Sequence, residues 1–91
     1  QYFSYPDWKF DRLRTEVPGH YEAYVDLVTG AWTKMRIEVD GDKAKLFVHD
    51  LEHPIIIVND LKHGPDQKGG IALYIDNGTE GFFRNLQVTH K

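Results

Sequence analysis

The chain contains no cysteine, which excludes disulfide bridges, thiolate metal ligands and cysteine nucleophiles. It also has no long hydrophobic run. The longest uninterrupted apolar stretch, residues 54–58, is far shorter than the roughly 20 residues that a transmembrane helix needs. We therefore expect a protein that has no membrane span and that folds by noncovalent packing alone.

Charge of one sign is not gathered into a block anywhere along the sequence. The formal net charge of −3 comes from 11 basic and 14 acidic residues that are interspersed. Because nucleic-acid-binding domains concentrate basic residues on one face, we expect no nucleic-acid partner. Hydrophobic residues make up 41% of the 91 positions, which is enough for one packed core, and a chain of this length has no room for a second. Residues 1–91 are therefore predicted to form a single domain.

Period-two alternation of apolar and charged residues is clearest in residues 34–39, which predicts an antiparallel strand with one buried face. The Asp40-Gly41-Asp42 sequence that follows is typical of a hairpin, because glycine accepts the positive φ that a tight turn requires. Residues 44–48 then form the returning strand, and residues 69–76 and 81–88 form another pair around an Asn77-Gly78 turn. We expect these residues to face the core: Met35, Ile37, Val39, Ala44, Leu46, Val48, Ile71, Leu73 and Ile75.

Further strands are predicted at residues 21–27 and 54–58, and a short helix at residues 8–14, capped by Asp7 and ended by Pro18-Gly19. The sum is about six antiparallel strands, a partial β-sandwich. Such a sheet leaves unpaired edges, so we expect either a homo-oligomer or an N-terminal half of the domain that lies outside this sequence. The first residue is glutamine rather than methionine, which also suggests a processed chain or an excerpt.

Four short motifs follow one another in an order that carries a family resemblance: residues 32–39 (WTKMRIEV), 44–48 (AKLFV), 70–73 (GIAL) and 83–86 (FRNL). Over residues 21–88 the chain resembles the C-terminal half of a concanavalin A-like lectin/glucanase domain, close to laminin-G-like and bacterial keto-glycoside-hydrolase-like domains. The resemblance implies an all-β antiparallel jelly-roll β-sandwich. It also implies a carbohydrate-linked function outside the cytoplasm, either in the periplasm or as a secreted protein. The E-x-D-x-x-E motif of the glucanases has no counterpart here, so the resemblance implies no defined reaction.

The sheet face opposite the predicted core is unusually rich in aromatic and hydrogen-bonding side chains. Aromatic rings stack on the C–H faces of sugars, and planar polar groups beside them bind hydroxyls. A solvated outer face with cross-strand pairs, or a face that packs against a subunit or a missing half, would have the same composition. The ligand-binding candidates are Tyr24, Arg36, Phe47, His49, Tyr74 and Asp76.

These observations favour a carbohydrate-binding or structural module of unknown ligand. The alternatives are a domain that serves only for assembly and a glycoside-active hydrolase whose catalytic groups lie partly outside the chain or across a subunit interface. A hydrolase would need Glu38 and Asp76, or Glu22, to share a shielded cleft that raises a carboxyl pKa. No catalytic residue is nominated.

The sequence contains no established metal-binding motif, although it has possible metal ligands. Three histidines lie near acidic residues in the sequence, but their spacing matches no established zinc motif, so no metal ligand is nominated and no cofactor is expected. Calcium remains open because domains of the resembled family often carry it. The histidines concerned are His49, His53 and His63, near Asp50, Glu52, Asp60 and Asp66.

Overall fold

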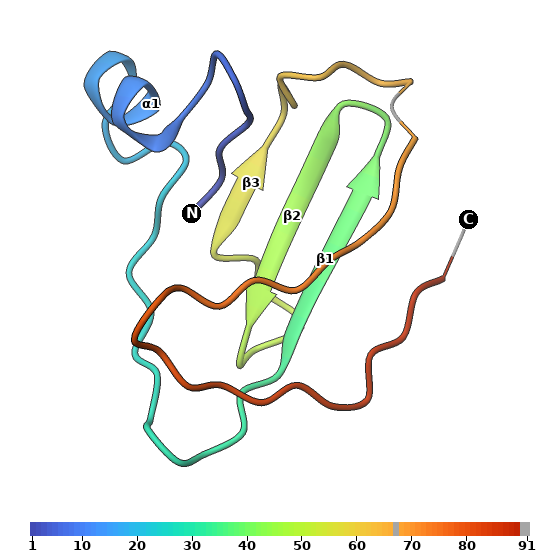
Figure 1. The fold of residues 1–91 in the computed structure, drawn as a ribbon. Coiled ribbons are helices and arrows are strands. Elements are labelled where there is room, and N and C mark those ends of the chain that lie inside the picture. Colours follow the sequence, from blue (N-terminus) through green and yellow to red (C-terminus); the bar gives the residue numbers. More distant parts are fainter. Residues whose placement is uncertain (67, 90–91) are drawn as a thin grey trace.

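The computed structural model describes residues 1–66 and 68–89. It contains one helix, α1 (Phe10–Glu16), and three strands, β1 (Met35–Asp40), β2 (Lys43–Val48) and β3 (Ile56–Val58). The strands form one antiparallel sheet in the order β1-β2-β3, with the helix at one end of it (Figure 1). Within the described ranges, no helix has the length and apolar character needed to cross a bilayer.

The predicted hairpin is confirmed. β1 and β2 pair so that Asp40 lies opposite Lys43, which makes Gly41-Asp42 a two-residue turn. Gly41 has a φ of 62°, in the left-handed region where a side chain is strained. The sequence therefore places glycine where the backbone geometry of the turn demands it.

One face of the sheet is apolar, as the alternation predicts, but only half of it is covered. Ile56 and Val58 on β3 are 6% and 2% exposed. The β1 side chains of the same face remain 61%, 65% and 59% exposed at Met35, Ile37 and Val39. The prediction that these strands share one apolar face is therefore correct, but the predicted burial is wrong for β1 and also for Ile71, Leu73 and Ile75, which lie outside the sheet and are exposed. In register across the three strands, this apolar face consists of Met35, Ile37, Val39, Ala44, Leu46, Val48, Ile56 and Val58.

The covered half of the apolar face lies under the N-terminal part of the chain. Leu13 of α1 and Tyr21 are 3% and 4% exposed and form one cluster with the two β3 side chains. Tyr2 packs against this cluster, and its hydroxyl accepts a hydrogen bond from the Lys62 amide at 2.8 Å. The core thus sits between α1, the N-terminal segment and β3.

The helix lies two residues further along the chain than the predicted residues 8–14, and it ends before the Pro18-Gly19 pair as expected. α1 stops at Glu16, directly before Val17 and the Pro18-Gly19 pair. At its start, Lys9 occupies the cap position without a side-chain hydrogen bond. Asp7, the predicted cap, instead accepts a bond through its backbone carbonyl from Arg12 Nη1 at 2.9 Å. The prediction of Asp7 as cap is therefore wrong.

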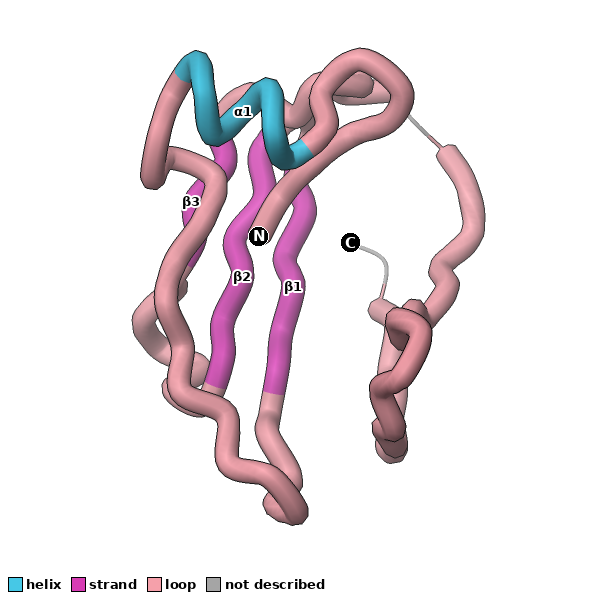
Figure 2. The backbone as a smooth tube through the Cα atoms, turned by 60° about the vertical axis from the view of Figure 1, so that its left-hand side comes forward, coloured by secondary structure: helices cyan, strands magenta, loops and turns pink. Residues whose placement is uncertain are grey.

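The prediction of a jelly-roll β-sandwich with about six strands is wrong, because the described residues form three strands in one sheet. Residues 21–27, 69–76 and 81–88 join no ladder. In Figure 1 the C-terminal segment crosses in front of β1 and β2, and Figure 2 shows it standing apart from the strands. Alternation predicts which side chains share a face of an extended chain, but it does not supply a backbone partner. The Asn77-Gly78 turn does form, since the Thr79 amide donates to the Asp76 carbonyl at 3.1 Å.

Candidate functional site

A cleft of about 460 Å³ lies between the first ten residues of the chain and residues 74–76, and we call it the aromatic cleft. Its walls come from the N-terminal segment and from the extended segment that precedes the Asn77-Gly78 turn. Both walls are far apart in sequence and neither belongs to the sheet. The lining residues are Gln1, Phe3, Tyr5, Phe10, Tyr74 and Asp76.

The N-terminal wall owes its shape to a small closed loop. Ser4 and Trp8 exchange two backbone hydrogen bonds of 2.7 and 2.8 Å. Because the Ser4 side chain points inward and is 5% exposed, alternation turns Phe3 and Tyr5 outward. Their rings meet edge to face with centroids 5.6 Å apart, and Lys9 Nζ lies 5.2 Å from the Tyr5 ring. The wall therefore presents two exposed rings beside a cation.

The opposite wall combines a ring with a carboxylate. The Tyr74 hydroxyl donates to Asp76 Oδ1 at 3.1 Å, and the Asn77 amide donates to the same oxygen at 2.8 Å. In the described part of the chain nothing bonds to Asp76 Oδ2. The second oxygen is therefore free to accept a hydrogen bond from a ligand, and the Tyr74 ring, with Tyr74 81% exposed, is free to stack.

The chemistry of the aromatic cleft suits a ligand with both C–H faces and hydroxyl groups. Rings supply apolar surface, while a carboxylate accepts hydrogen bonds from hydroxyls. Gln1, which also lines the cleft, adds a side-chain amide whose Nε2 donates to Glu22 Oε1 at 2.7 Å and whose carbonyl oxygen can accept a hydrogen bond. Small-molecule sites are usually lined by apolar and aromatic side chains with a small number of polar groups among them, and this cleft has that composition.

Two of the six predicted ligand-binding residues, Tyr74 and Asp76, line this cleft, and the other four lie elsewhere. Tyr24 and His49 meet at Asp26. The Tyr24 hydroxyl donates to Asp26 Oδ1 at 2.5 Å, and His49 Nε2 lies 2.7 Å from the Asp26 carbonyl oxygen. The hydrogen bond to Asp26 raises the pKa of Tyr24.

Arg36 and Phe47 form a third group on the polar face of the sheet. The Arg36 guanidinium lies 4.3 Å from the centroid of the Phe47 ring and donates to the Leu51 carbonyl at 2.6 Å. Phe47 is only 4% exposed. Because Arg36 covers its ring, Phe47 cannot stack on a ligand in this arrangement.

Sequence reasoning missed the N-terminal wall. Its signal was the density of rings in the first ten residues, where aromatic side chains alternate with small and polar ones. The sequence predicted a helix at residues 8–14 with Asp7 as its cap and assigned no role to residues 1–6. Phe10 does begin that helix but is 45% exposed, and the remaining wall residues precede it.

The three carboxylates that a hydrolase would have needed lie in different surroundings. Asp76 lines the aromatic cleft, whereas Glu38 pairs with Arg36 at 3.1 Å and Glu22 pairs with Arg14. The hydrogen bond from Arg14 lowers the pKa of Glu22, which keeps this carboxylate charged. A general acid requires the opposite shift, so this arrangement does not favour glycoside hydrolysis.

A serine and a histidine also meet, from positions 59 residues apart in the sequence. Ser4 Oγ lies 2.5 Å from His63 Nε2, a contact that a nucleophilic serine would use. Among residues 1–66 and 68–89, no carboxylate bonds to the other ring nitrogen of His63 to orient it. The contact instead joins the N-terminal segment to the loop after β3.

Among the residues that the structure describes, one group of potential metal ligands is present. Ligand atoms of Asp50, Glu52 and His53 lie within 4.8 Å of one another, all on exposed side chains. Asp50 is already engaged, because its Oδ1 accepts from the Glu52 amide at 2.8 Å and its Oδ2 lies 2.7 Å from His53 Nδ1. The first of these bonds contributes most to lowering the pKa of Asp50. The group is therefore held together by its own hydrogen bonds.

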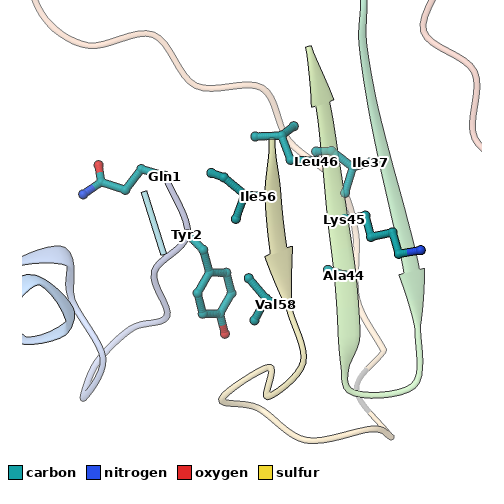
Figure 3. Close-up of a pocket in the computed structure, with 8 residues that line it drawn as sticks. All are labelled: Gln1, Tyr2, Ile37, Ala44, Lys45, Leu46, Ile56 and Val58. Atoms are coloured by element: carbon teal, nitrogen blue, oxygen red, sulfur yellow. The ribbon is translucent and has the colours of Figure 1, made fainter. Parts of the chain in front are cut away.

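A second, smaller pocket of about 130 Å³ opens on the apolar face of the sheet (Figure 3). Tyr2 and Ile56 form one side of it, and Ile37 on β1 forms the other. Of the side chains that line it in the described residues, Lys45 alone is charged. The pocket is the place where the covered half of the apolar face gives way to the uncovered half.

Comparison of the chain with protein-family models, with curated proteins and with solved structures finds no match. The concanavalin A-like resemblance of the four motifs therefore stays a prediction.

Proposed function

We propose that this protein binds a neutral oligosaccharide in the aromatic cleft. The observation that carries the proposal is the convergence of four aromatic side chains, three from residues 1–10 and one from residue 74, on one cleft that also contains a carboxylate with an oxygen to which no described residue bonds. Rings at exposed positions have no structural need to gather in this way, since a buried core already exists elsewhere.

A carbohydrate fits this lining better than a purely apolar ligand does. The edges of a sugar are covered with hydroxyls, which match Asp76 Oδ2 and the Gln1 carbonyl oxygen, while its C–H faces match the rings. An acidic sugar would be repelled by the Asp76 carboxylate. We therefore assign stacking to Phe3, Tyr5 and Tyr74, and hydroxyl binding to Asp76 and Gln1.

The experiment is a glycan-array screen followed by calorimetric titration of the best neutral glycan. Tyr74→Ala should weaken binding about tenfold, because one stacked ring is worth about 1 kcal/mol or more. Tyr24→Ala is a matched control. Tyr24 is also highly exposed, at 87%, and bonds to an aspartate two residues on, but it lies outside the cleft.

Unchanged affinity in Tyr74→Ala, or equal losses in both variants, would contradict the proposed site. No binding of any glycan by the wild-type protein would leave a purely structural module as the better function.

We propose to run the calorimetric titration both with and without calcium, to test whether the ion supports binding. Asp50 and Glu52 supply oxygen ligands of the kind calcium prefers. A carbohydrate-binding role also fits a location outside the cytoplasm, which fractionation of the producing cells would test.

A further inference from the structure

We propose that the free edge of β1 pairs with β1 of a second copy of this chain, antiparallel and centred on Ile37, to make one continuous six-stranded sheet. This inference is independent of the aromatic cleft. It follows from three properties of residues 34–40: an unpaired backbone edge, exposed apolar side chains and a self-complementary order of charges.

The backbone of β1 has an outward-facing row of hydrogen-bonding groups. The His49 amide donates to the Lys34 carbonyl at 2.9 Å, which extends the β1–β2 ladder by one pair. Because antiparallel residues alternate in direction, Lys34, Arg36 and Glu38 direct their backbone groups toward β2. Met35, Ile37 and Val39 direct theirs away from the sheet. Outside the sheet, no backbone hydrogen bond between described residues reaches these three.

The order of side chains along this edge matches itself when reversed. In an antiparallel pair centred on Ile37, that residue lies opposite the partner's Ile37, and Met35 lies opposite the partner's Val39. Arg36 then lies opposite the partner's Glu38, and Lys34 lies opposite the partner's Asp40. A two-fold axis repeats each of these pairs, so every charge along the shared edge faces its opposite.

This register is also the one that the backbone allows. Outward-facing residues must meet outward-facing residues, which restricts the shift between the strands to steps of two. Moving the centre to Arg36 would place two arginines opposite each other, and moving it to Glu38 would do the same for two glutamates. Like charges directly opposite are destabilising, so charge selects the register centred on Ile37.

Burial favours the same contact. Met35, Ile37 and Val39 are each about three-fifths exposed, on the part of the apolar face that α1 and the N-terminal segment do not cover. Pairing at the edge would place apolar side chains of the partner's β1 next to these three side chains and bury part of their surface. Glu38, which already lies 3.1 Å from Arg36 of its own chain, would then lie between two arginines. The strand contains no proline that would block edge pairing, and its charged side chains, which oppose pairing with most other strands, are matched by opposite charges in this register.

The test is the mass in solution, measured by sedimentation or light scattering, of the wild-type chain and two charge variants. The wild type should form a dimer of twice 10.6 kDa. Arg36→Glu and Glu38→Arg should each raise the dissociation constant about tenfold or more, because each places like charges opposite each other. Mixed in equal amounts, the two variants should form a heterodimer with affinity near that of the wild type, since opposite charges then face each other again.

Two control variants change charge equally at exposed positions around the start of α1, on the β3 side of the sheet: Lys9→Glu and Asp11→Lys should leave the dimer unchanged. If Arg36→Glu fails to fold because Phe47 loses its cover, Lys34→Asp mixed with Asp40→Lys provides the same rescue. A wild type that stays monomeric up to about 1 mM would overturn the proposal. Folded variants that remain dimeric alone, or show no rescue when mixed, would also overturn it and indicate packing through the apolar faces instead.

Discussion

At the scale of single residues, the side chains that matter most are held by contacts between positions distant in sequence. Phe47 was predicted to face a ligand because it alternates with core residues of β2. Its ring is instead covered by Arg36, which reaches over it from β1 and bonds to Leu51. Alternation assigns a side chain to a face of the sheet, but it cannot tell whether another side chain will cover it.

Phe47→Ala should therefore lower stability rather than change binding. Removing a ring that is 4% exposed leaves a cavity and removes the cation–π contact, with an expected loss of about 3 kcal/mol in the free energy of unfolding. Urea denaturation measures this loss. Val48→Ala, a smaller truncation at a neighbouring buried position, should cost about half as much. A Phe47→Ala protein as stable as the wild type would show that the ring is not packed as described.

Asp60 provides a residue-scale prediction on pH. Hydrogen bonds from Lys62 and then from Tyr21 hold the pKa of Asp60 below its ordinary value of 3.8. A carboxyl whose pKa is lowered by folding stabilises the protein above that ordinary value, and the stabilisation is lost as the pH falls through the folded-state pKa. Because the side chain is half exposed, the effect should be only about 0.5 kcal/mol.

Asp60→Asn should remove this contribution at neutral pH and flatten the acid limb of the stability curve below about pH 4. Thermal unfolding measured across pH 2.5–7 would show this change. Asp66→Asn, at an exposed aspartate in the same loop, is the control and should leave the acid limb as in the wild type. Identical acid limbs in the wild type and Asp60→Asn would contradict the Asp60 contacts.

At the scale of elements, the β1–β2 hairpin is the part of the fold that sequence predicted best. Its strands alternate cleanly, its turn carries glycine where φ must be positive, and all pairing is local. The extended segments at residues 69–76 and 81–88 alternate equally well, and their turn forms, yet they enter no sheet. Strand pairing depends on what lies beside a segment, and that is a property of the whole chain rather than of the segment.

Gly41→Ala tests the hairpin directly. The added Cβ would meet Pro65 Cβ at an ordinary 3.9 Å, so the cost comes from the backbone, which holds φ at 62°. We expect a loss of about 1 kcal/mol in the free energy of unfolding. Gly69→Ala, where φ is not positive and no atom lies within 4 Å, should leave stability unchanged or slightly raised. Equal effects in the two variants would argue against the turn.

At the scale of the whole molecule, the position of the N-terminal segment underlies both proposals. The N-terminal segment and α1 cover the β3 side of the apolar face and leave the β1 side open, which provides the edge for a second copy. The same N-terminal segment turns Phe3 and Tyr5 outward to meet Tyr74 and Asp76. Sequence alone nominated Tyr74 and Asp76 of this cleft, although it placed them on the outer face of a sheet that does not extend to residues 69–76. It missed the N-terminal half, whose orientation depends on the Ser4–Trp8 backbone pairing.

The most direct test of the binding account is an NMR titration of the isotopically labelled protein with the best neutral glycan from the array. The account predicts that amide signals of Phe3, Tyr5, Tyr74 and Asp76 shift together along one saturating curve, while those of Tyr24, Arg36 and His49 stay in place. Shifts confined to Tyr24, Arg36 and His49, or to only one of the two walls of the aromatic cleft, would contradict a site built from both walls.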